Sequence, residues 1–190
     1  MALKFTLPNI LTLFRLLVGP LFFYVYTTGQ SPEAALLLLT LLAAAEGSDL
    51  LDGYLARRWN QVTDLGKILD PFADSLYRMA VLLTLTLPPV SLPLYLILII
   101  LYRESAISTL RTVVALRGVA LQARWSGKVK AVLQGTVIVV ITSLFYLYKL
   151  EIVDVEDLAA VSSNLALVAA VYTFISGVEY LVTQLRHKED

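Results

Sequence analysis

Apolar residues fill six long segments of the chain, and short polar breaks separate them. The segments cover residues 8–28, 33–57, 69–87, 92–116, 129–148 and 157–185. A helix that crosses a bilayer needs about 20 mostly apolar residues, so the pattern predicts six transmembrane helices. Gly29 and Pro32 lie in the first break and Pro88-Pro89 in the third, as is typical of turns. With no internal repeat or long linker, we expect a single membrane domain over residues 1–190.

Composition agrees with a membrane location and excludes several kinds of site. The chain is 58% hydrophobic and 16% charged, with a mean hydropathy of +0.75, whereas soluble domains carry roughly 25% charged residues. Its 15 basic and 15 acidic residues cancel, which argues against a nucleic-acid partner. The chain has no cysteine and one histidine, His187. Thiolate zinc sites, cysteine nucleophiles and histidine-based triads are therefore excluded.

The distribution of the basic residues predicts the orientation. Six crossings place both chain ends on one side of the membrane, together with the loops at 57–66 and 117–127. Of the 15 Lys and Arg residues, all except Lys149 lie toward that side. Basic residues concentrate on the cytoplasmic side of a membrane. We therefore expect an all-α integral membrane protein of the inner (cytoplasmic) membrane, a six-helix transmembrane bundle with both termini cytoplasmic.

Several aspartates interrupt this apolar pattern, although an acidic side chain at the centre of a spanning helix costs roughly 2.5–3.5 kcal/mol. Asp49 and Asp52 lie at the end of the second segment, and Asp70 and Asp74 at the start of the third. Spacings of three and four residues place each pair on one helix face. Because the connecting loop is short, the two helices are expected to be antiparallel neighbours that bring the four carboxylates together at their cytoplasmic ends.

Four clustered carboxylates repel one another unless protons, arginines or metal ions compensate them. An all-oxygen ligand set without His or Cys favours the hard cations Mg²⁺ and Mn²⁺. Gly53, Ala56 and Gly66 leave room for a bulky ligand, and Arg57 supplies a planar fork suited to phosphate. Together these residues predict a phosphate-ester substrate. The alternative interpretation is helix capping and solvation at a membrane boundary.

The residues of this region follow one another at fixed spacings, Asp49-x2-Asp52-Gly53-x2-Ala56-Arg57, eight further residues, and then Gly66-x3-Asp70-x3-Asp74. The pattern resembles the motif of the CDP-alcohol phosphotransferase family, also called CDP-alcohol phosphatidyltransferases. Stretches at 8–15, 51–61, 103–111 and 126–130 resemble the bacterial phosphatidylglycerophosphate synthases within it. The resemblance extends over most of the chain, and the last apolar segment adds little to it.

The resemblance implies a six-helix membrane bundle, a homodimer, with two divalent metal ions at its cytoplasmic end. The residues that match metal ligands are Asp49, Asp52 and Asp70, with Asp74 matching a general base close to or touching the second metal. The residues that match the part holding the cytidine nucleotide donor are Gly53, Ala56, Arg57 and Gly66. The implied reaction is phospholipid synthesis, in which a phosphatidyl group passes from CDP-diacylglycerol to an acceptor hydroxyl by in-line displacement and CMP leaves.

A second set of cations is expected to bind the acceptor. Arg103 and Arg111 lie eight residues apart in the fourth segment, and Lys128 and Lys130 open the fifth. Of the two lysines, Lys128 is the one that we expect at the site. Arg103 sits well inside an apolar run, where an uncompensated arginine is costly, and the adjacent Glu104 offers partial compensation. Cations this deep suggest an anionic acceptor, and we expect glycerol 3-phosphate, which would give phosphatidylglycerophosphate.

Other activities remain open from the sequence. Ser75 follows Asp74 where synthases of the family commonly carry lysine, so another acceptor with the same donor is an alternative: inositol phosphate, serine or phosphatidylglycerol. A remote alternative is a cation or proton transporter that uses intramembrane carboxylates. A transporter would be expected to carry its charges near the midplane and internal repeats, whereas these carboxylates cluster at one end.

Overall fold

The computed structural model describes residues 7–58, 64–116 and 125–186, and this part of the chain is helical apart from three connections. Its helices are α1 (Leu7–Thr28), α2 (Pro32–Arg58), α3 (Asp64–Thr84), α4 (Leu94–Leu116), α5 (Trp125–Lys149) and α6 (Val155–Arg186). The described residues form no strand. The expected all-α fold with six helices is therefore confirmed.

Two helices begin four or five residues earlier than the apolar pattern predicts. The third begins at Asp64 rather than at residue 69, and the fifth at Trp125 rather than at residue 129. The additional turns contain Lys67 and Lys128, which interrupt an apolar run but have good helix propensity. At its other end α3 stops at Thr84, before the turn that contains Pro88 and Pro89, because proline cannot continue a helix.

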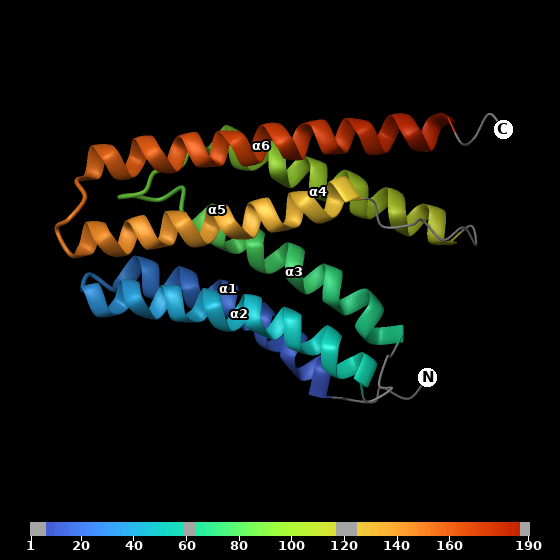
Figure 1. The fold of residues 1–190 in the computed structure, drawn as a ribbon, viewed down its shortest axis with the longest axis horizontal. Coiled ribbons are helices and arrows are strands. Elements are labelled where there is room, and N and C mark those ends of the chain that lie inside the picture. Colours follow the sequence, from blue (N-terminus) through green and yellow to red (C-terminus); the bar gives the residue numbers. More distant parts are fainter. Residues whose placement is uncertain (1–6, 59–63, 117–124, 187–190) are drawn as a thin grey trace.

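The helices run up and down the bundle, so that α1 begins and α6 ends at the same end (Figure 1). The ends of α2 and α4 and the starts of α3 and α5 lie there too. We call this the site end. The connections at 29–31, 85–93 and 150–154 lie at the opposite end.

The core lies where the helices pack in two groups of three. In one group α1 packs against both α2 and α3, and in the other α6 packs against α4 and α5. A contact between α2 and α5 joins them. The approach of α1 to α3 is close, since a Cβ on Gly19 would lie 2.8 Å from the Cβ of Ala80. The core side chains include Phe22, Leu38, Ile141 and Phe145.

Three of the helices are long and apolar enough to cross a membrane by their length and composition. Within the described residues these stretches are Ile10–Thr28, Trp125–Lys149 and Val155–Thr183, with mean hydropathies of 1.7, 1.8 and 1.8. Their outward faces are apolar as well, with Leu17, Val132 and Phe174 among the exposed side chains. A bundle that exposes large apolar residues along its length fits a lipid environment better than water.

Candidate active site

The site end gathers the expected carboxylate positions. Asp49 and Asp52 lie in the final turns of α2, while Asp70 and Asp74 lie in the first half of α3, and both stretches reach the site end (Figure 1). Of these side chains the structure describes that of Asp74. The expected site residues whose side chains lie outside the described part are Asp49, Asp52, Gly53, Ala56, Arg57, Gly66, Asp70 and Arg111.

Asp74 is held by an arginine one helical turn later. Arg78 Nε donates to Asp74 Oδ1 at 2.9 Å, an i,i+4 pairing that a helix favours. The Asp74 side chain is 30% exposed and that of Arg78 is 9% exposed. One carboxylate oxygen is thus oriented by a buried cation while part of the carboxylate stays accessible. The residue directly after Asp74 is Ser75 rather than lysine. Arg78, four residues after Asp74, is a cation that contacts the carboxylate.

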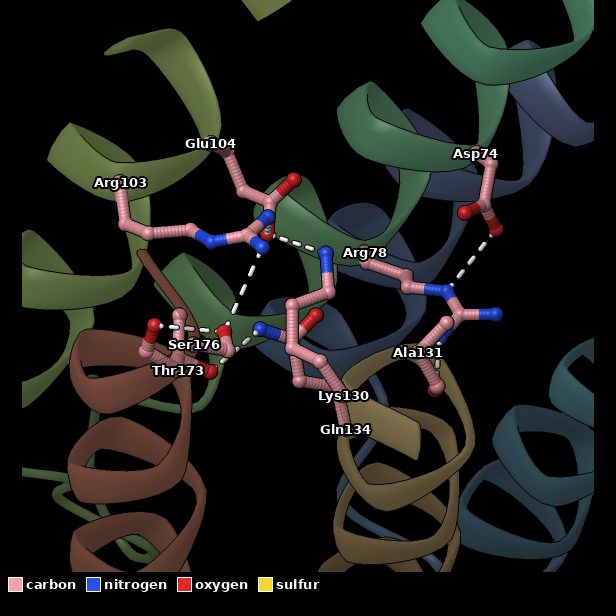
Figure 2. A network of polar contacts seen from close by, with 9 residues as sticks. All are labelled: Asp74, Arg78, Arg103, Glu104, Lys130, Ala131, Gln134, Thr173 and Ser176. Carbon is pink, nitrogen blue, oxygen red and sulfur yellow. Dashed lines mark hydrogen bonds and ion pairs between the residues drawn. The ribbon is translucent and has the colours of Figure 1, made fainter. Parts of the chain in front are cut away.

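The same arginine connects three helices (Figure 2). A terminal nitrogen of Arg78 donates to the backbone carbonyl of Ala131 in α5. Its other terminal nitrogen lies 3.5 Å from Glu46 Oε2 in α2. Among the described residues this side-chain pair links α3 to α2, whereas the two helices each pack against α1 rather than against one another. Arg78 therefore orients Asp74 from a position fixed by both flanking helices.

A groove opens beside this arginine. It has a volume of about 440 Å³ and is lined by Glu46, Arg78, Ala131, Val132, Gly135, Thr136, Val139 and Val140. At the polar end of the groove, Gly135 lets the side chains of Glu46 and Arg78 lie close to α5. A Cβ on this residue would lie 3.4 Å from Glu46 Oε1 and 3.5 Å from a terminal nitrogen of Arg78. The groove is polar near Arg78 and apolar along α5, so it suits a ligand that has a polar and an apolar part.

A second ionic cluster joins α4, α5 and α6 (Figure 2). Glu104 Oε1 accepts from Lys130 Nζ and lies 3.4 Å from a terminal nitrogen of Arg103. The other terminal nitrogen of Arg103 donates to Ser176 Oγ at 3.3 Å. Arg103, one of the expected acceptor residues, thus lies in a buried polar cluster as anticipated. We call Arg103, Glu104 and Lys130 the cation cluster.

Hydrogen-bonded polar side chains of α5 and α6 lie next to the cation cluster. Ser176 Oγ donates to the carbonyl of Thr173 at 2.9 Å, and Gln134 Nε2 donates to Thr173 Oγ1 at 3.1 Å. All three residues are buried. Gly177 makes room for the arginine, because a Cβ there would lie 2.8 Å from Arg103 Cγ. Hydrogen bonds and a missing side chain on α6 therefore both fix where Arg103 lies.

The structure distinguishes the two lysines that open α5. Lys128, which the sequence favoured, is exposed, and its Nζ lies 5.2 Å from the centre of the Trp125 ring. Lys130 is buried and pairs with Glu104. Residues two apart on a helix point about 200° away from each other, so the two lysines occupy different faces. The buried Gln134 one turn after Lys130 is the signal that could have identified the inward face.

No group of three or more Asp, Glu or His side chains that could hold a metal occurs among the described residues. Three of the four expected ligands, Asp49, Asp52 and Asp70, lie outside that part of the structure. The geometry that can be assigned is that of Asp74, with one oxygen engaged by Arg78 and its carboxylate partly exposed. A carboxylate in that state suits either proton transfer or metal ligation.

Together the fold and these contacts define an all-helical protein with apolar helices long enough to span a membrane and with ion pairs buried between its helices. The sequence model of the CDP-alcohol phosphatidyltransferase family matches residues 5–178. The chain belongs to this family. It is therefore a phosphatidyltransferase by family, in agreement with the resemblance of the aspartate motif.

Several individual proteins are similar to this chain over half of its length or more. CDP-diacylglycerol–glycerol-3-phosphate 3-phosphatidyltransferase of Bacillus subtilis is 35% identical over 188 residues, covering 93% of each chain. A probable phosphatidylglycerophosphate synthase of Mycobacterium tuberculosis is 34% identical over 182 residues, covering 95% of this chain and 82% of the relative. Cardiolipin synthase (CMP-forming) of Streptomyces coelicolor is 45% identical over 102 residues. That last match spans about half of each protein, 53% of this chain and 47% of the relative.

Proposed function

We propose that this protein is a CDP-diacylglycerol–glycerol-3-phosphate 3-phosphatidyltransferase. It transfers the phosphatidyl group of CDP-diacylglycerol to glycerol 3-phosphate and releases phosphatidylglycerophosphate and CMP. The observation that carries the proposal is the similarity to the Bacillus subtilis enzyme of that name, which covers 93% of both chains. The complete aspartate motif from Asp49 to Asp74 supports the same reaction class.

The proposed setting is the cytoplasmic membrane, crossed six times, with both termini and the site end facing the cytoplasm. The three apolar stretches in α1, α5 and α6 support spanning by those helices. The common end at which α1 begins and α6 ends supports an even number of crossings (Figure 1). The one-sided distribution of the basic residues supports the orientation. A homodimer remains part of the proposal on the strength of the family resemblance.

The donor lipid is proposed to lie along the groove beside Arg78. CDP-diacylglycerol combines an anionic pyrophosphate with two acyl chains, and the groove combines Arg78 at one end with Val132, Val139 and Val140 along its length. The cytidine nucleotide would be held by Gly53, Ala56, Arg57 and Gly66, where small residues leave space and an arginine binds phosphate.

Two divalent ions, Mg²⁺ or Mn²⁺, are proposed to bind Asp49, Asp52, Asp70 and Asp74. This set offers oxygen ligands alone, as hard cations require. The partly exposed carboxylate of Asp74 fits such a role, because Arg78 engages Oδ1 and leaves part of the group accessible. When bound, the metals would neutralise the pyrophosphate and stabilise the charge that develops during displacement.

Asp74 is the proposed general base. The acceptor hydroxyl oxygen forms a bond to the phosphorus that carries the diacylglycerol, while the bond from that phosphorus to the oxygen of CMP breaks. The hydroxyl proton passes to the Asp74 carboxylate, and the bonding electrons leave with CMP. Arg78 orients the carboxylate through a hydrogen bond of 2.9 Å.

The acceptor phosphate is proposed to bind Arg103, Arg111 and Lys128, with Lys130, the second lysine at the start of α5, as a further candidate. The side chains of Arg103 and Lys130 are buried and both contact Glu104. Charged N–H donors of this kind suit an anionic acceptor. Phosphatidylglycerol is a second candidate acceptor, because the cardiolipin synthase of Streptomyces coelicolor is 45% identical over 102 residues.

Release of CMP by the purified protein tests the proposal. The protein is reconstituted with CDP-diacylglycerol and supplied in turn with glycerol 3-phosphate, phosphatidylglycerol, inositol phosphate and serine. CMP release that depends on glycerol 3-phosphate supports the proposed function. Release with phosphatidylglycerol alone would reassign the protein as a cardiolipin-forming enzyme. Absence of CMP with every acceptor would contradict a transferase.

A further inference from the structure

The guanidinium of Arg78 gives each of its three nitrogens a different partner. Nε donates to Asp74 Oδ1 at 2.9 Å, Nη1 donates to the carbonyl of Ala131, and Nη2 lies 3.5 Å from Glu46 Oε2. These partners belong to α3, α5 and α2, respectively. Within the described part of the chain, Arg78 therefore contacts Asp74 through one nitrogen and one oxygen (Figure 2).

A planar guanidinium can also bind a carboxylate at two points. Nη2 lies on the same edge as the Nε–H group, and together these nitrogens form a fork that fits both oxygens of one carboxylate. Such two-point pairs are frequent between arginine and Asp or Glu. In this structure the edge is shared between two carboxylates, because Nε binds Asp74 while Nη2 approaches Glu46.

Burial determines what Arg78 would do without Glu46. The Arg78 side chain is 9% exposed, so a released Nη2 has little access to water, and an unsatisfied buried donor is costly. Asp74 already lies on the same edge of the guanidinium, and its side chain is 30% exposed. Without Glu46 we therefore expect Nη2 to turn to Asp74 Oδ2 and complete the fork.

Glu46 is less buried than the arginine that it contacts. Its side chain is 33% exposed and lines the groove beside Arg78. Removing it would leave Arg78 paired with Asp74 and with the Ala131 carbonyl. Compensation of the buried cation therefore does not depend on Glu46, and substitutions there are expected to fold.

We propose that Glu46 is a positioning residue for the transfer reaction. It holds Nη2 of Arg78 and so limits the contact with Asp74 to one oxygen. Oδ2 of Asp74 then stays available to the proton of the acceptor hydroxyl. Glu46 acts through Arg78 and takes no part in proton transfer itself. The inference rests on the proposed role of Asp74 as base, and one of the measurements below does not depend on activity.

Glu46→Met and Glu46→Gln test this role. Methionine has a similar length but offers no strong acceptor, whereas glutamine keeps an oxygen that can accept from Nη2. A structure of Glu46→Met should place Arg78 within about 3 Å of both oxygens of Asp74. The kcat for CMP release should fall about tenfold in Glu46→Met, since small displacements of a reacting group are costly, and less in Glu46→Gln.

The KM values distinguish positioning from a general loss of structure. Neither the KM for CDP-diacylglycerol nor that for glycerol 3-phosphate should rise by more than about twofold, whereas a disturbed fold would impair the binding of both. Glu156→Met is the matched control, because Glu156 is exposed near the start of α6, at the opposite end of the bundle. Its substitution should change neither kcat nor KM.

A double variant shows whether Glu46 acts through the fork of Arg78. Arg78→Lys replaces the guanidinium by an ammonium, which has no fork. Adding Glu46→Met to Arg78→Lys should therefore leave kcat as it is in Arg78→Lys alone. If Glu46→Met gives too little folded protein, Glu46→Gln carries the same comparison with a smaller expected effect.

Several results would overturn the positioning role. They are an unchanged kcat in Glu46→Met, an equal fall with and without Arg78→Lys, and a contact with Asp74 that stays at one oxygen in the structure of Glu46→Met. An unaltered protein that releases no CMP, together with a completed fork in Glu46→Met, would refute the proposed function and leave the effect of Glu46 on Arg78 intact.

Discussion

Arg78 Nε lies 2.9 Å from Asp74 Oδ1, one turn apart on α3, and the same guanidinium reaches Glu46 in α2 and the Ala131 carbonyl in α5. The proposed general base is therefore oriented by a residue anchored on two other helices. Rigid support of this kind is what catalytic geometry requires, because small displacements of a reacting group are costly. The predictions below separate the base, its support, the acceptor site and the metals.

Asp74→Asn should abolish turnover while the donor still binds in part. The amide has nearly the same shape but cannot accept the hydroxyl proton, and a general base contributes roughly 10²–10⁴-fold to rate. CMP release measures turnover, and retention of labelled CDP-diacylglycerol measures binding. Activity near that of the unaltered protein would refute the assignment of Asp74 as base.

Arg78→Gln should lower both stability and turnover. It removes a donor to Asp74 and to the Ala131 carbonyl, and a hydrogen bond to a charged group contributes about 1.5–3 kcal/mol. Thermal unfolding in detergent measures the first effect and CMP release the second. Arg78→Lys is the matched variant: it keeps the charge but cannot serve three partners at once, so intermediate values are expected. Unchanged unfolding and turnover in Arg78→Gln would contradict the supporting role.

Gly177→Ala should weaken the acceptor site without touching the aspartates. The new Cβ would lie 2.8 Å from Arg103 Cγ, so the arginine stem must move, at a cost of roughly 1–3 kcal/mol for overpacking. The expected result is a severalfold rise in the KM for glycerol 3-phosphate. Gly47→Ala is the control, because a Cβ there meets nothing within 4 Å. Equal effects of the two alanines would show that the clash is irrelevant.

Removal of divalent ions should stop the reaction reversibly. A chelator in excess is expected to abolish CMP release, and added Mg²⁺ or Mn²⁺ should restore it, because the aspartate set offers oxygen ligands alone. Ca²⁺ is a useful comparison, since its longer bonds and larger coordination number distort a site built for smaller ions. Full activity after exhaustive chelation would contradict the metal proposal.

The sequence predicted most of the fold because bilayer length and hydropathy fix where helices lie. It placed the starts of α3 and α5 four to five residues late, at 69 and 129 rather than at Asp64 and Trp125, because charged first turns interrupt an apolar run without ending a helix. Asp74 and Arg103 could be selected from the sequence because a charged side chain inside a membrane-spanning helix is energetically costly. The sequence could not rank Lys130 above Lys128, because burial of a lysine depends on where a partner such as Glu104 lies.

By its spacing Arg78 shares a helix face with Asp70 and Asp74, where it could neutralise them, and the structure pairs it with Asp74. The motif draws attention to the residue directly after Asp74, which here is serine. The cation that contacts Asp74 instead occupies the next turn of α3. Spacing identifies which residues share a face, but which of them reach one another depends on the side chains and on the neighbouring helices.

Lys130 and Ala131 follow one another at the start of α5, one joining the cation cluster and the other accepting from Arg78. Their Cα atoms are separated by about 3.8 Å, the fixed spacing across a trans peptide bond. Covalent connectivity therefore largely sets the distance between Lys130, proposed to bind the acceptor, and the Ala131 carbonyl that holds Arg78 beside Asp74. A tilt or sliding of α5 as a whole would carry both together, so the bundle can flex within a bilayer while the two anchor points keep their spacing.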